Sequence, residues 1–337
     1  MQRLYLATRW RSGRGAGDVV AGQPAPLPAG DAESVACALA AEAAALGPEA
    51  TKAAVGADLA AQALAAARAM HAVYGGGGDR QQRSGSDLAA SFAAAHGHAL
   101  AARPSSIPGA GAGVFVEAAT PLPPGTLVAF YPGAAYPPLT HRALPGYPQV
   151  DRGGAFLMAR YDGTILDAAA WGRGAGDACG APLRDREGGG ANPVIPGPAA
   201  AAVEAALGRG CDPRNPLALG HLANHPPPGG APNVMAAALD VVRWAGSVLA
   251  AEPWLRRYLP VAVCGEEEEG KHGEEEARGG GANPPAQPTP LPLLALVAVR
   301  PLPPGTELLL NYRLSPHLAK PDWYAAVDED EDARRWA

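Results

Sequence analysis

The sequence predicts a mainly β protein with an α-helical appendage, and two observations support this fold class. From about residue 104 to residue 315, short runs of valine, leucine, phenylalanine and tyrosine alternate with Pro/Gly turns, as they do in small β-sheets. Residues 31–103 are instead rich in alanine, the residue with the highest intrinsic helix propensity. No apolar run approaches the roughly 18 to 20 residues that a membrane-spanning helix requires, so no membrane partner is expected.

Composition divides the chain into four regions. The first 17 residues carry four arginines and no acid, so residues 1–30 are interpreted as either a disordered or a targeting-like N-terminus. Residues 31–103 form the Ala-rich helical region, which a Gly-rich linker interrupts. Residues 104–315 form the β-rich domain, and residues 316–337 form a C-terminal tail.

Two insertions are expected within the β-rich domain. Residues 172–216 are rich in loop-forming residues, and residues 265–290 are of low complexity with seven glutamates. Charged, Gly-rich runs of this kind bury little surface and are typical of solvated loops.

Charge and cysteine usage exclude several classes of protein. The net charge of −6 and the pI of 5.8 argue against a strongly basic protein that binds nucleic acid directly. The four cysteines lie far apart and lack a C-x-x-C pair, so neither a disulfide framework nor a zinc site is expected. A reducing compartment, nucleus or cytoplasm, is favoured, and organellar targeting remains the alternative.

A repeated turn marks the two ends of the β-rich domain. The sequence PLPPGT occurs at residues 121–126 and again at residues 301–306, each time between an apolar run and a second run that ends in tyrosine. Proline followed by glycine at the centre of a turn is typical of a type II turn. The sequence therefore predicts two similar strand–turn–strand units.

One histidine pair has the spacing of a metal site but lacks the rest of the pattern. His221 and His225 lie four residues apart in HLANH, yet the glutamate that a zinc protease needs as base is absent. Three prolines follow at once, so a helix that aligns both rings cannot continue. No metal site is predicted.

Four segments, taken in order, resemble the SET-domain protein lysine methyltransferases. That family shows a G-x-G strand, a Y-x-G strand, an N-H-S-C-x-P-N segment and an E-L-x-x-D-Y segment in the same order. The corresponding segments here are GAGVFV (111–116), LVAFYPG (127–133), LGHLANH with a following PN (219–225 and 232–233), and GTELLLNY (305–312). The run ILDA (165–168) also resembles the I-D-A strand of the family. The chain is most similar to the small branch called SET domain-containing protein 9.

The resemblance implies a SET fold, in which small sheets surround a pseudoknot formed by the end of the chain, and it implies S-adenosyl-L-methionine as the cofactor. Gly111 and Gly113 would let the main chain approach the methionine part. Asn224 and His225 would contact the adenine and amino acid parts, and Tyr312 would lie beside the methyl group.

The resemblance further implies methyl transfer to a lysine side chain of a protein or peptide. Tyr312 and Tyr131 would be the catalytic tyrosines, with Tyr131 lining the acceptor channel and Glu307 supporting the strand crossing. The acceptor amine must be neutral and in line with the bond that breaks, so positioning and desolvation carry much of the rate enhancement.

Because the sequence departs from the family pattern at three places, a second interpretation of the function stays open. HPPPGGAPN replaces H-S-C-x-P-N, Asn311 replaces aspartate before the tyrosine, and no cysteine follows Tyr312 to bind a zinc ion. The alternative is a non-catalytic SET-fold protein that binds a peptide or scaffolds a complex. A β-rich domain whose four matches are coincidental is the third possibility.

Overall fold

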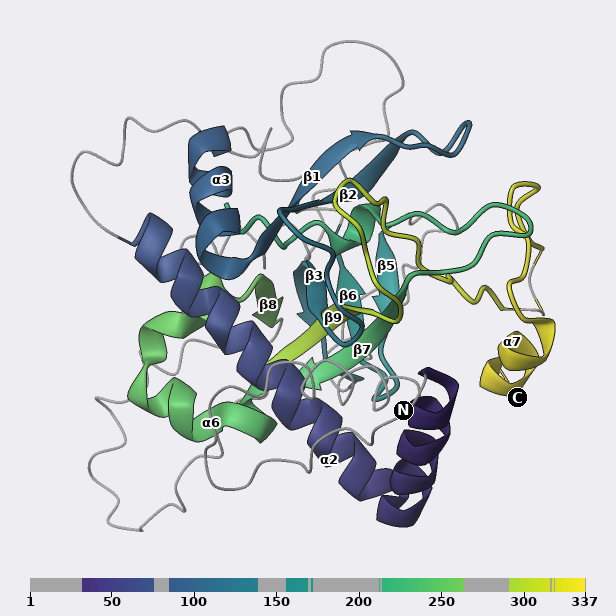
Figure 1. Cartoon of the computed structure of the whole chain (residues 1–337), viewed down its shortest axis with the longest axis horizontal. Helices are drawn as coiled ribbons and strands as arrows, with labels where there is room; N and C mark the ends of the chain where they lie inside the picture. Colours follow the sequence, from purple (N-terminus) through teal and green to yellow (C-terminus); the bar gives the residue numbers. More distant parts are fainter. Residues whose placement is uncertain are drawn as a thin grey trace, which may run out of the picture.

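The computed structural model describes residues 32–75, 85–138, 156–168, 171, 212, 214–263, 291–315, 317 and 319–336. Within these ranges the architecture is mixed helix and sheet, with small sheets, an N-terminal helix and no barrel (Figure 1). The expected mainly β class is thus too narrow, because helices make up a large part of the described chain. The predicted N-terminal region 1–30, the insertion 265–290 and most of the insertion 172–216 lie outside the described residues.

The strands of the described residues form three small sheets. A two-stranded sheet pairs β1 (His98–Pro104) with β2 (Ala112–Ala118). A three-stranded antiparallel sheet has the order β3 (Leu127–Tyr131), β9 (Pro292–Ala298), β7 (Val234–Asp240). A four-stranded sheet has the order β5 (Leu157–Ala159), β6 (Ile165–Asp167), β4 (Gly133–Tyr136), β8 (Val261–Val263), with β4 and β8 parallel.

Helices surround these sheets. The α-helices are α2 (Ala32–Tyr74), α3 (Gly85–His96), α6 (Val241–Ala251) and α7 (Glu329–Trp336), and the 3-10 helices are η3 (Gly220–Leu222) and η4 (Pro253–Tyr258). Helix α2 is kinked where Gly47, with φ of 77°, precedes Pro48, because proline cannot donate the backbone hydrogen bond that a continuous helix needs. Among the described residues, no helix is both long and apolar enough to span a bilayer.

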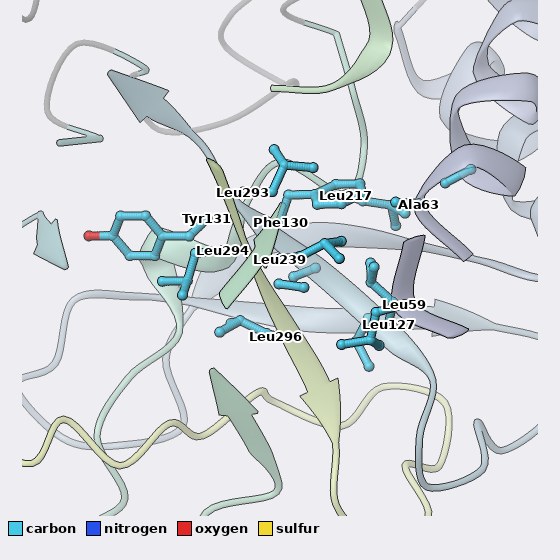
Figure 2. Packing of buried hydrophobic residues seen from close by; sticks show 14 of the residues in the cluster. Leu59, Ala63, Leu127, Phe130, Tyr131, Leu217, Leu239, Leu293, Leu294 and Leu296 are labelled. Carbon is cyan, nitrogen blue, oxygen red and sulfur yellow. The ribbon is translucent and has the colours of Figure 1, made fainter. Parts of the chain in front are cut away.

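Helix α2 packs directly on the three-stranded sheet. Leu59 and Ala63 of α2 are fully buried in one core with Leu127 and Phe130 of β3, as Figure 2 shows. Tyr131 points to the opposite side of β3, because consecutive side chains of a strand alternate between its two faces. The Ala-rich region is therefore part of the core rather than a separate appendage.

One side chain of α2 completes the hydrogen bonding of the sheet. The register of β3 against β9 shifts between Leu127 and Ala129. At this irregularity, Gln62 accepts a hydrogen bond from the Leu127 amide at 2.8 Å and donates one to the Gly125 carbonyl at 3.0 Å. Since unpaired backbone groups in a protein interior are costly, Gln62 joins the helix to the sheet specifically.

The two PLPPGT turns lie against each other. Leu122 and Leu302, at the same place in the two copies, exchange a pair of antiparallel backbone hydrogen bonds of 2.9 Å. The strand before each turn also pairs with the glycine of the other turn: the Gly125 amide donates to Ala298, and the Gly305 amide donates to Val116. The sequence repeat is therefore an approximate structural repeat about the Leu122–Leu302 pair.

The residues after the second turn run between two other parts of the chain. On one edge, the Leu308 amide donates to the Val114 carbonyl of β2 at 2.8 Å. On the other edge, the Leu310 amide donates to the Asn224 carbonyl at 2.8 Å, and the Asn233 amide donates to Leu309 at 3.0 Å. We call residues 305–310 the threaded segment, because this late part of the chain is enclosed between two earlier ones.

A buried histidine, His98, and a partly buried one, His96, lie where α3 meets β1. The ring of His96 lies 4.8 Å from the ring of His98, and His98 Nε2 is 3.2 Å from the Val128 carbonyl of β3. The pKa of each histidine is lowered from the ordinary 6.5 to about 4, by burial for His96 and by burial together with the nearby His96 for His98. Both imidazoles are therefore neutral at physiological pH.

Removal of the Gln62 amide tests whether α2 belongs to the core. We expect Gln62→Ala to lower the free energy of unfolding by about 1 to 3 kcal/mol, because the Leu127 amide and the Gly125 carbonyl lose their partners. The matched control is Glu49→Ala on the exposed side of the same helix, which should change it by less than about 0.5 kcal/mol. Urea denaturation of both variants measures the difference, and equal effects would show that α2 is only loosely attached.

Acidification tests the histidine pair. Because the pKa of His98 is lower in the folded protein than in the unfolded chain, protonation favours the unfolded chain. The free energy of unfolding is therefore unaffected above pH 6.5 and falls as the pH drops from 6.5 towards 4. We expect the loss to reach about 2 kcal/mol for His98 by pH 4.5, and His98→Gln to flatten the pH dependence of unfolding. The exposed His317→Gln is the control, and a pH profile that is the same in all three proteins would contradict the assignment.

Candidate active site

Two of the other sequence segments singled out above, 111–116 and 305–312, meet at Asn224, and the segment 127–133 contacts His221 of the same LGHLANH run. Its side-chain amide donates to the Ala112 carbonyl of β2 at 3.0 Å and to the Glu307 carboxylate at 3.1 Å. Its backbone carbonyl accepts from the Leu310 amide. A short distance along the chain, His221 of η3 contacts Tyr131 of β3 edge-on, with 6.3 Å between ring centroids. Segments far apart in the sequence therefore form one site.

Glu307 is the only acid within the threaded segment, and its carboxylate is almost fully buried, with 7% of the residue exposed. It accepts hydrogen bonds from Ser105 Oγ at 2.6 Å, from Ser106 Oγ at 2.5 Å, from the Ser106 amide at 2.9 Å and from Asn224. Burial raises the pKa of a carboxyl group, but here these hydrogen bonds outweigh burial, and the pKa of Glu307 lies below its ordinary value. Glu307 is therefore ionised at neutral pH.

The two glycines expected at the cofactor have different structural roles. Gly113 lies in β2 beneath the Glu307 carboxylate, and a Cβ at this position would come within 2.2 Å of Glu307 Oε1. Gly111 has φ of 74°, a backbone conformation that side chains disfavour, and a Cβ there would meet no atom within 4 Å. Open space beside the main chain is therefore found at Gly111, whereas Gly113 leaves room for Glu307.

His225 connects the site to the C-terminal part of the chain. Its Nδ1 accepts a hydrogen bond from the Tyr312 amide at 3.3 Å, so the proton lies on Nε2, which donates to the Ala325 carbonyl at 2.7 Å. The ring also stacks on Tyr324, with 4.5 Å between centroids. Burial lowers the pKa of His225, in agreement with a neutral ring. Both ring nitrogens are occupied, so any contact of His225 with a cofactor would use its main chain.

The two expected catalytic tyrosines lie near each other and are both protonated at neutral pH. The Tyr312 hydroxyl donates to the Ala223 carbonyl at 3.0 Å, and burial raises the pKa of Tyr312 to about 12. Burial raises the pKa of Tyr131 well above its ordinary value, and the neighbouring Tyr312 and Asp167 contribute to the same effect. Neither tyrosine is a phenolate, so each offers a neutral hydroxyl group.

Aromatic residues that the sequence analysis did not single out surround these tyrosines. Phe156 contacts His221 edge-on at 5.6 Å, and Trp323 contacts Tyr312 edge-on at 6.1 Å, with 57% of Trp323 exposed. Trp323 and Tyr324 belong to the region predicted as a C-terminal tail. Only their aromatic character in an otherwise polar stretch could have indicated that they pack on the site.

The serines before the glycines were also missed. Ser105 and Ser106 precede β2 and supply most of the donors to Glu307. A pair of serines in a Pro-flanked loop is common in turns, so the sequence alone carries no signal that they bind a carboxylate 202 residues away.

The segment HPPPGGAPN, which departs from the family pattern, forms a defined turn. The Gly230 amide donates to the Pro227 carbonyl at 2.8 Å, and Gly229 has φ of 76°, which glycine adopts without strain. Asn233 then donates to the Glu307 carbonyl at 2.7 Å and accepts from the Leu309 amide at 2.7 Å. The loop is altered in sequence, but its final asparagine is held firmly against the threaded segment.

No group of three or more metal-ligating side chains occurs among the described residues.

A pocket of about 340 Å³ lies away from the candidate site, at the ends of β4, β8 and β9, and is lined by Arg160, Asp162 and Asp240 together with prolines. It shares no lining residue with the cluster around Asn224, so the pocket adds nothing to this site.

Comparison with known proteins supplies no family for this chain. No protein-family model matches it, and no curated protein matches its sequence.

Substitution of the two glycines separates their roles. We expect Gly113→Ala to destabilise the fold by about 1 to 3 kcal/mol, because the added methyl group displaces the Glu307 carboxylate. Gly111→Ala should cost about 1 kcal/mol from backbone strain alone, without a clash. Thermal unfolding of both variants is the measurement, and a Gly113→Ala protein as stable as wild type would contradict the packing described here. The bulkier Gly113→Val is therefore expected to perturb the fold as well as any bound cofactor.

Proposed function

We propose that the protein has a SET fold and transfers a methyl group from S-adenosyl-L-methionine to a lysine side chain of a protein or peptide. The observation that carries this proposal is that the four segments resembling the SET family lie together: 111–116 and 305–312 bond to Asn224, and 127–133 contacts His221 of the same LGHLANH run. The threaded segment supports the SET assignment, because the resemblance implies a pseudoknot at the same place.

The residues present fit this cofactor. The main chain at Gly111 borders open space. Both amide hydrogens of Asn224 are donated, and within the described part of the chain no donor is bonded to its Oδ1, so Oδ1 would be free to accept from the cofactor's amino group. Gly111 and Asn224 would therefore hold S-adenosyl-L-methionine, which supplies a methyl group on a positively charged sulfur.

The tyrosines fit the requirements of the acceptor. A lysine amine reacts only in its neutral form, so its site must exclude water and offer neutral oxygen atoms. Tyr131 is buried, and the Tyr312 hydroxyl donates to Ala223 while its oxygen retains lone pairs that can accept an N–H. These oxygens would orient the amine towards the methyl group, and orientation of this kind supplies a large share of enzymatic rate enhancement.

A second function has its own supporting observation. The Tyr312 hydroxyl and both ring nitrogens of His225 already bond to main-chain groups of the protein. In a non-catalytic SET-fold protein, the same groups would serve only to hold the site together. Such a protein would bind a partner peptide or scaffold a complex without methyl transfer.

Tyr312→Phe distinguishes the two functions. Loss of a transition-state oxygen contact in a dry site costs about 3 kcal/mol, so we expect turnover to fall roughly a hundredfold. Affinity for S-adenosyl-L-methionine should change much less, because the hydroxyl acts mainly in the transition state. Transfer of labelled methyl groups to lysine-bearing proteins measures turnover, and calorimetry measures cofactor affinity.

The matched control is Tyr161→Phe, which removes a hydroxyl from a tyrosine that is 60% exposed in the β5–β6 hairpin. It should leave turnover unchanged. Equal turnover in the Tyr312→Phe and wild-type proteins would remove Tyr312 from the mechanism. No transfer by the wild-type protein, with partner binding intact in both, would favour the scaffold.

A further inference from the structure

A backbone hydrogen bond joins the two ends of the loop that precedes β2. The Ser105 amide donates to the Gly111 carbonyl at 2.8 Å, and within the loop the Ala110 amide donates to the Ile107 carbonyl at 3.1 Å. We call residues 105–111 the glycine loop. It joins β1 to β2, and Gly111, with its left-handed backbone, is its last residue.

The glycine loop is attached to the rest of the protein through a carboxylate. Ser105 and Ser106 donate three hydrogen bonds to Glu307, and Ser105 Oγ also accepts one from the Ile107 amide at 3.0 Å. We call Ser105, Ser106 and Glu307 the serine latch. Because Glu307 belongs to the threaded segment, the latch fixes the loop to the part of the chain that also holds Asn224.

The serine latch depends strongly on each hydrogen-bond donor to the Glu307 carboxylate. Glu307 has no ion-pair partner among the described residues, so its charge is balanced only by neutral O–H and N–H donors. Hydrogen bonds to a buried charge are stronger than those between neutral groups, and each missing donor leaves that charge less well solvated. Loss of the serine hydroxyls therefore weakens the attachment of the loop more than loss of an ordinary surface serine would.

We propose that Ser105 and Ser106 are positioning residues for the cofactor: through Glu307 they hold Gly111 in the conformation that binds S-adenosyl-L-methionine. This inference rests on the proposed function. It assigns to two serines outside the resembling motifs a share of the cofactor affinity, although neither needs to touch the cofactor itself.

The test uses the full-length chain and the double variant Ser105→Ala/Ser106→Ala. We expect amide hydrogen exchange at Ile107 and Ala110 to accelerate, and the dissociation constant of S-adenosyl-L-methionine to rise roughly tenfold or more. Ser247→Ala on the exposed side of α6 is the matched control and should leave both measurements unchanged. Ser106→Thr keeps the hydroxyl and should bind the cofactor close to the wild-type level, whereas Ser106→Ala should not.

The outcomes separate the latch from the proposed function. Unchanged exchange in the double variant overturns the latch. Faster exchange with unchanged cofactor affinity overturns the positioning role. Wild-type protein that does not bind S-adenosyl-L-methionine overturns the proposed function and with it the positioning role, while the exchange rates still decide whether the serines hold the loop.

Discussion

The threaded segment imposes a constraint on which the site depends: its backbone groups are enclosed on both edges and must find partners there. On one edge β2 provides them, and on the other the residues around Asn224 and Asn233 do so. Asparagine side chains supply hydrogen-bond partners that the main chain does not: the Asn233 side chain donates to the Glu307 carbonyl and accepts from the Leu309 amide. The elements that carry the candidate site are thus held together by the same hydrogen bonds that satisfy this segment.

A buried negative charge is placed at the centre of that arrangement. Glu307 lies over Gly113, which has no side chain to displace it, and draws donors from the glycine loop and from Asn224. Hydrogen-bond networks in a low dielectric are strong when complete and costly when incomplete. The glycine in β2, the serines before it and the asparagine after η3 are therefore parts of one polar unit.

Sequence patterns predicted the strands better than they predicted the arrangement of helix and sheet, and the roles of the site residues stay predictions. The apolar run ending in Tyr131 forms β3, whereas among the described residues the run ending in Tyr312 pairs only through isolated bridges at Glu307, Leu309 and Leu310. Residues 98–103 were assigned to the Ala-rich region, yet they form most of β1, because pairing with β2 outweighs the weak strand propensity of alanine. The contacts of Gln62, Ser105 and Tyr324 join distant parts of the chain, and no local pattern encodes them.

The two paired PLPPGT turns also determine when this chain can complete its fold. Leu122 pairs with Leu302, far along the chain, and the second edge of β2 is covered only by residues 305–308. A growing chain on the ribosome would therefore expose that edge until residues 302–308 have been made. Contacts between such distant residues slow folding, because a long loop must close before they form. The assembly of this domain is thus expected to be slow, despite its long helix, because it waits for residues 302–310.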